Sequence, residues 1–195
     1  MKTLLAALAV VLAPSFAAAH VGVGDANSIA HGFMHPLSGI DHLLAMLAVG
    51  LFAAHLGGRA LWLVPLSFVA VMACGGVLGM AGIGLPHVEI AIGLSVVVLG
   101  IVVAMRVNPP VAIAMALVGF CALFHGHAHG TEIPERASGL AYSAGFVLAT
   151  ALLHLIGIGL GTWIGEAGRR YSRTIAQIAG GAMALAGIAI LGGAL

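Results

Sequence analysis

Six apolar stretches, each close to the length that crosses a bilayer, constrain this chain more than any other feature. A helix rises 1.5 Å per residue, so about 20 apolar residues span a hydrocarbon core of roughly 30 Å. Only 7% of the 195 residues are charged, whereas an ordinary soluble domain carries about 25% and needs them to face water. The sequence therefore predicts an all-α membrane protein, a six-helix transmembrane bundle that forms a single domain over residues 20–195. The predicted spans cover residues of about 36–56, 61–82, 87–105, 110–128, 138–162 and 174–194.

Residues 1–19 have the pattern of an N-terminal signal peptide. Lys2 supplies the positive charge, an apolar run follows, and small residues up to Ala19 precede a predicted cleavage ahead of His20. An uncleaved additional helix is the alternative. Both alternatives place the residues that follow outside the cytoplasm.

Arginines predict the orientation of the bundle. If the first span begins outside, three connections between spans lie in the cytoplasm, and they hold five arginines against the single Arg136 in the external connections. This excess is what the positive-inside rule predicts. We therefore expect a multi-pass protein of the bacterial inner membrane, in contact with the lipid bilayer. The five arginines are Arg59, Arg106, Arg169, Arg170 and Arg173.

Histidines and acidic residues gather at three points along the chain. The chain has 10 histidines, and such side chains are costly in hydrocarbon and mark functional sites. The predicted topology places all three groups at the external, periplasmic side of the membrane. They are His35, Asp41 and His42 at the start of the first span, Glu89 at the start of the third, and His125, His129 and Glu132 at the end of the fourth.

The spacing within the first group predicts one stripe on one helix. Pro36 is suited to a first helical turn, so we expect the span to begin there with His35 and His42 about two turns apart on the same face. Asp41 would lie roughly 9 Å below the helix start. An uncompensated charge at that depth costs about 3 kcal/mol, and a bound cation would offset it.

The second group forms a similar stripe if the fourth helix continues far enough. His125, His129 and Glu132 would then share a face, with His127 pointing elsewhere. Glycines within this segment could instead fray the helix end.

Imidazole and carboxylate together are the ligands of borderline divalent ions such as Ni²⁺, Co²⁺ and Zn²⁺. Each residue also has a structural explanation. His35 could cap its helix, Asp41 could form a buried ion pair with His42, and Glu89 could complement a helix dipole. Three groups at one membrane level favour the metal site over three separate structural causes.

Two further residues lie deeper in the predicted bundle. Met46, one turn below His42, could be a soft ligand, and His154 in the fifth span could be a relay or exit ligand. For Met46 a place in the packed core is the preferred interpretation, and for His154 a packing role explains the residue equally well.

The two motifs together resemble those of the HupE/UreJ family of nickel and cobalt permeases. The first motif is His-x5-Asp-His from His35 to His42, and the second is Phe-His-Gly-x-Ala-His-Gly-x-Glu from Phe124 to Glu132. The resemblance runs from the signal peptide through all six spans. It implies secondary transport of a metal that supplies hydrogenase, urease or cobalamin pathways, with the motif residues as ligands and Glu89 as a looser match.

We therefore expect uptake of a divalent transition metal, nickel or cobalt, rather than an enzyme. No permanent cofactor and no nucleic-acid partner are expected, and the chain has no phosphate-binding loop for ATP. The alternatives are an intramembrane zinc-dependent hydrolase or a membrane metal sensor. The sequence leaves open which metal is preferred, how transport is coupled to energy, and whether the chain forms a homo-oligomer.

Overall fold

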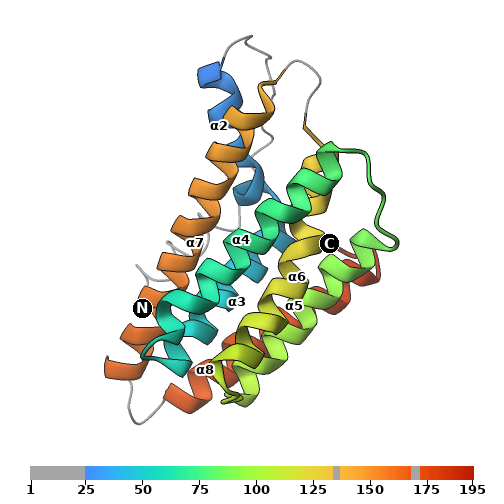
Figure 1. Cartoon of the computed structure of the whole chain (residues 1–195). Coiled ribbons are helices and arrows are strands. Elements are labelled where there is room, and N and C mark those ends of the chain that lie inside the picture. Colours follow the sequence, from blue (N-terminus) through green and yellow to red (C-terminus); the bar gives the residue numbers. More distant parts are fainter. Residues whose placement is uncertain (1–24, 134–136, 168–171) are drawn as a thin grey trace, which may run out of the picture.

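The described part of the chain is helical throughout, apart from short connections (Figure 1). The computed structural model describes residues 25–133, 137–167 and 172–195, so the predicted signal peptide lies outside it. Five helices, α4 to α8, are long and apolar enough to cross a membrane, and the bent pair α2–α3 makes up to six. The predicted all-α membrane fold is confirmed. The helices are α2 (Asp25–Ser38), α3 (Ile40–Leu56), α4 (Ala60–Met80), α5 (Val88–Met105), α6 (Val111–Thr131), α7 (Gly139–Ala167) and α8 (Ser172–Leu191).

The first span differs from the prediction. We expected one helix that begins near Pro36, but Pro36 lies inside α2, and α2 meets α3 with a bend of 81°. The bend falls at Gly39, whose extended backbone (φ −89°, ψ 118°) separates the two helices. The hydroxyl of Ser38 donates to the carbonyl oxygen of His35 (2.7 Å) and so satisfies one of the free acceptors at the end of α2. His35 and His42 therefore do not share a stripe of one helix, and that prediction was wrong.

Helix α3 is the centre of the bundle. It contacts α4, α5 and α7, and Met46, Val49 and Phe52 on it are fully buried. Met46 thus packs in the apolar core. The outer surface of the bundle exposes large apolar side chains, among them Trp62, Phe120 and Leu148, which is the surface that lipid solvates best.

Glycines bring α4 and α6 close together along their length (Figure 1). A Cβ added at Gly126 would overlap the carbonyl group of Met72, and a Cβ added at Gly130 would overlap that of Gly76. Small residues allow such backbone contact between membrane helices. The contact holds α6 helical as far as Thr131, so these glycines do not fray its end.

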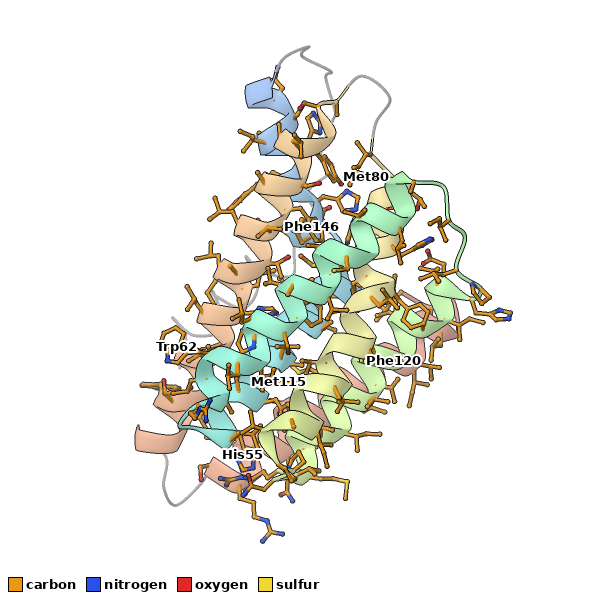
Figure 2. The ribbon with its side chains drawn as sticks, viewed as in Figure 1. His55, Trp62, Met80, Met115, Phe120 and Phe146 are labelled. Carbon is orange, nitrogen blue, oxygen red and sulfur yellow. The ribbon has the colours of Figure 1, made fainter. Side chains whose placement is uncertain are left out.

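The ends of α3, α5 and α7 and the starts of α4, α6 and α8 lie at one end of the bundle, whereas the ends of α4 and α6 and the starts of α5 and α7 lie at the other (Figure 1). Figure 2 labels His55 at the first end and Met80 at the second. Arg59 and Arg106 therefore lie at the opposite end from the residues that end α6 and begin α7.

Candidate metal site

Three histidines from α3 and α6 meet in the interior of the bundle. The ring centroid of His42 lies 4.7 Å from that of His125 and 4.3 Å from that of His129. Their exposed fractions are 7%, 0% and 4%. Because α6 continues to Thr131, His125 and His129 are one turn apart on the same buried face, as predicted. We call these three residues the histidine cluster.

Asp41 orients the ring of His42. Its Oδ1 accepts the backbone N–H of His42 (2.7 Å) and lies 2.7 Å from the Nδ1 of the same residue. A carboxylate only accepts hydrogen bonds, so Nδ1 carries the ring proton and Nε2 keeps a lone pair. That Nε2 is buried and has no hydrogen-bond partner among the described residues. A carboxylate behind a histidine is the usual arrangement around a bound metal.

Ser95 of α5 does the same for His125. The hydroxyl of Ser95 donates to the carbonyl oxygen of Ile92 (2.7 Å) and lies 2.8 Å from the Nε2 of His125. Its single proton is used in the first bond, so its oxygen must accept from Nε2–H. The Nδ1 of His125 then has the lone pair, and within the described chain nothing bonds to it.

A second group lies beside the cluster, nearer the end of the bundle at which α6 ends. The Nε2 of His35 lies 3.2 Å from Oε2 of Glu132, and the Nδ1 of His129 lies 3.8 Å from the same oxygen. The ligand atoms of the three residues all fall within 4.8 Å of one another, whereas two ligands on one ion are about 3 to 4 Å apart. A small side-chain movement would therefore close this group around a metal. We call His35, His129 and Glu132 the outer triad.

The bend between α2 and α3 makes the outer triad possible. It places the ring of His35 4.7 Å from that of His129, so the two motifs meet even though His35 and His42 are on different helices. His129 belongs to both groups. Glu132, whose side chain is 49% exposed, gives the triad a contact with water.

Comparison with known proteins identifies the kind of protein that carries this site. Residues 8–190 match the family described as "HupE / UreJ protein". The chain belongs to the HupE/UreJ family. It is 53% identical over 194 residues to "Protein HupE" from Rhizobium leguminosarum bv. viciae, which covers 99% of this chain and 97% of that protein. No solved structure matches the chain.

Two predicted features of this HupE/UreJ member lie apart from both groups. His127 points elsewhere, as predicted, and its Nε2–H donates to the carbonyl oxygen of Ile83 (2.7 Å). Glu89 is exposed in the first turn of α5. Among the contacts of the described residues, none joins Glu89 to the histidine cluster or the outer triad, so its role as a ligand stays a prediction.

Sequence reasoning missed two residues at the site. Ser95 is a serine within an apolar span, and nothing in its neighbours along the chain indicates a histidine partner. Tyr142 of α7 is buried, its ring lies 6.0 Å from that of His35, and its hydroxyl has no hydrogen-bond partner in the described residues. Both belong to helices other than those that carry the motifs.

Proposed function

We propose that this HupE/UreJ member is a secondary transporter that carries Ni²⁺ or Co²⁺ inward across the bacterial inner membrane. The observation that supports it is the orientation of the imidazoles. His42 and His125 each use one nitrogen to bond a neighbour and leave the other, buried nitrogen without a partner, and neither nitrogen of His129 has a hydrogen-bond partner. Buried polar atoms are rarely left unbonded, and a cation that passes through would use their lone pairs.

The outer triad is suited to capture. Glu132 is half exposed and acidic, so it can attract a hydrated cation from the periplasm. His35 and His129 then supply the imidazoles that borderline divalent metals prefer. Glu89, exposed at the start of α5, would add negative charge on the same side.

His129 provides the step from the outer triad to the histidine cluster because it belongs to both. In the cluster, His42 and His125 offer Nε2 and Nδ1 as ligands. The carboxylate of Asp41 lies directly behind His42 (2.7 Å) and offsets positive charge in a low-dielectric interior. Its main part in metal binding is therefore to hold and polarise the His42 ring.

The membrane potential would supply the energy. A divalent cation that moves inward gains about 4.6 kcal/mol per 100 mV. A proton gradient is the alternative source, with Asp41 or Glu89 as the group that exchanges the proton. By family resemblance, the imported metal would serve the maturation of a hydrogenase or urease.

Uptake into proteoliposomes tests this proposal. Wild-type protein should import Ni²⁺ or Co²⁺ faster when an inside-negative potential is imposed. Asp41→Asn keeps the shape and removes the charge, and we expect uptake to fall about 10- to 100-fold, the usual loss when a carboxylate behind a histidine ligand is changed.

The control is His31→Ala, because His31 is exposed on α2 and lies outside both groups. It should transport as the wild type does. If the wild type binds metal stoichiometrically but moves no divalent ion, the transporter proposal is wrong. A metal sensor or an intramembrane zinc-dependent hydrolase would then take its place.

A further inference from the structure

His154, near the middle of α7, is a buried histidine that the motifs do not include. It is 1% exposed, and neither of its ring nitrogens has a hydrogen-bond partner among the described residues. A buried polar atom without a partner destabilises the fold, because no hydrogen bond offsets the loss of its contact with water. An apolar side chain of similar size would avoid this cost, so the presence of an imidazole here requires an explanation.

His154 lies farther than the histidine cluster from the end of the bundle that carries the outer triad. On α7, the ring of Phe146 lies 3.9 Å from that of His129, and His154 follows eight residues later, about 12 Å along the helix. Gly50 of α3 packs against the backbone of His154. The level of His154 is therefore between the level of Phe146 and that of His55, both labelled in Figure 2.

One aromatic ring links this histidine to the cluster. The ring centroid of Phe68 lies 5.9 Å from that of His125 and 5.1 Å from that of His154. The two histidines thus contact the same fully buried side chain from two helices, α6 and α7. An ion that leaves His125 toward the opposite end of the bundle would next meet His154.

Two further donor atoms accompany His154. Thr150 lies one turn before it on α7 and is fully buried, and its hydroxyl donates to the Sδ of Met72 at 3.8 Å. Met72 lies one turn from Phe68 on α4, on the side toward the end of that helix, and its carbonyl group contacts Gly126 of α6. The hydroxyl and the thioether therefore lie nearer the level of the histidine cluster than His154 does. An imidazole, a hydroxyl and a thioether therefore line facing stretches of α4 and α7 within an otherwise apolar core.

We propose that His154 forms an inner site, at which the transported cation stops between the histidine cluster and the cytoplasm, and that Thr150 and Met72 line the path from the cluster to it. This rests on the proposed function. Imidazole and thioether suit borderline and soft transition metals. The three side chains are neutral, so they would hold a hydrated divalent cation weakly, and weak sequential sites are what permeation requires.

A matched pair of variants tests the inner site in proteoliposomes. His154→Leu and His154→Met differ little in volume, but only methionine offers a ligand atom. We expect Ni²⁺ uptake by the leucine variant to fall about tenfold or more, as when other metal-binding partners are lost. The methionine variant should retain most of the wild-type uptake. Both variants should keep wild-type Ni²⁺ affinity at the histidine cluster, measured by calorimetry in detergent.

Thermal unfolding separates transport from packing. If the imidazole serves only structure, both variants should lose stability and uptake together. In our proposal the midpoint of the leucine variant stays the same or rises, because an unbonded buried ring has been removed, while its uptake falls. Met72→Leu should also slow uptake, whereas Met183→Leu, a buried methionine of α8, should not.

The outcomes distinguish the two proposals. Equal uptake by the leucine and methionine variants, in a wild type that does transport, would overturn the inner site and leave the transport function intact. A wild type without uptake of any divalent ion would overturn both. Should His154→Leu fail to fold, uptake by His154→Met and by Met72→Leu decides the same question. The inner site predicts that His154→Met retains uptake and that Met72→Leu slows it, and equal uptake by these two variants would overturn it.

Discussion

At the scale of single residues, the partners of the histidines determine which nitrogens can bind a metal. Asp41 holds the proton on Nδ1 of His42, and Ser95 holds the proton on Nε2 of His125. The two rings are therefore oriented by neighbours of different chemistry, one charged and one neutral. In metal sites such partners are worth about 10- to 100-fold in affinity.

Ser95→Ala tests the neutral partner. The change removes the acceptor for Nε2–H, which frees the His125 ring to rotate or to change tautomer, so we expect Ni²⁺ affinity to fall about tenfold. Calorimetry on purified protein in detergent measures it. Ser67→Ala is the matched control, because the Ser67 hydroxyl also bonds a carbonyl three residues earlier (2.8 Å to Val64). Unchanged affinity in Ser95→Ala would show that this hydrogen bond does not orient a ligand.

At the scale of helices, the close contact between α4 and α6 supports the end of α6 that carries the second motif. The contact depends on glycines that flank the histidines, since Gly126 follows His125 and Gly130 follows His129. The second motif therefore contains packing positions as well as the proposed ligands.

Gly126→Ala should separate these helices. The added Cβ has no space against the carbonyl group of Met72, and overpacking of this kind typically costs about 1 to 3 kcal/mol. Thermal unfolding in detergent should show a lower midpoint than for the wild type. Gly159→Ala on α7 is the control, because its Cβ would meet open space, and there alanine should be neutral or stabilising by up to about 1 kcal/mol. A wild-type midpoint for Gly126→Ala would contradict the observed packing.

At the scale of the whole molecule, the two ends of the bundle carry different side chains. The outer triad lies toward one end, and Arg59 and Arg106 lie at the other (Figure 1). The positive-inside rule predicts that the arginine end lies in the cytoplasm, and in that orientation the outer triad would face the periplasm.

Cysteine labelling tests this orientation. In a background with Cys74→Ala and Cys121→Ala, a membrane-impermeant maleimide added to intact spheroplasts should label Gly84→Cys, in the exposed α4–α5 connection, and not Asn108→Cys, in the exposed α5–α6 connection. Both variants should be labelled after the membrane is dissolved in detergent. The reverse pattern would invert the predicted topology and make the proposed direction of transport wrong.

The sequence by itself determined the helices and the family. In a bilayer the backbone must satisfy its own hydrogen bonds, so each long apolar run becomes a helix and its length predicts the span. Helices α4 to α8 follow the predicted spans closely, although α7 extends further, to Ala167. The one-turn spacing of His125 and His129 was also readable from the sequence, because it depends only on local helix geometry. The signal peptide over residues 1–19 and the ligand role of Glu89 remain predictions.

Only the tertiary structure decided which residues of different helices meet. The bend at Gly39 moved His35 away from the stripe of His42 and against His129, and a proline and a glycine in sequence do not specify such an angle. Ser95 contacts His125 because α5 packs beside α6, and His154 contacts Phe68 because α7 packs beside α4. Periodicity within one segment tells which face is apolar, whereas contacts between helices depend on how side chains of distant segments fit together.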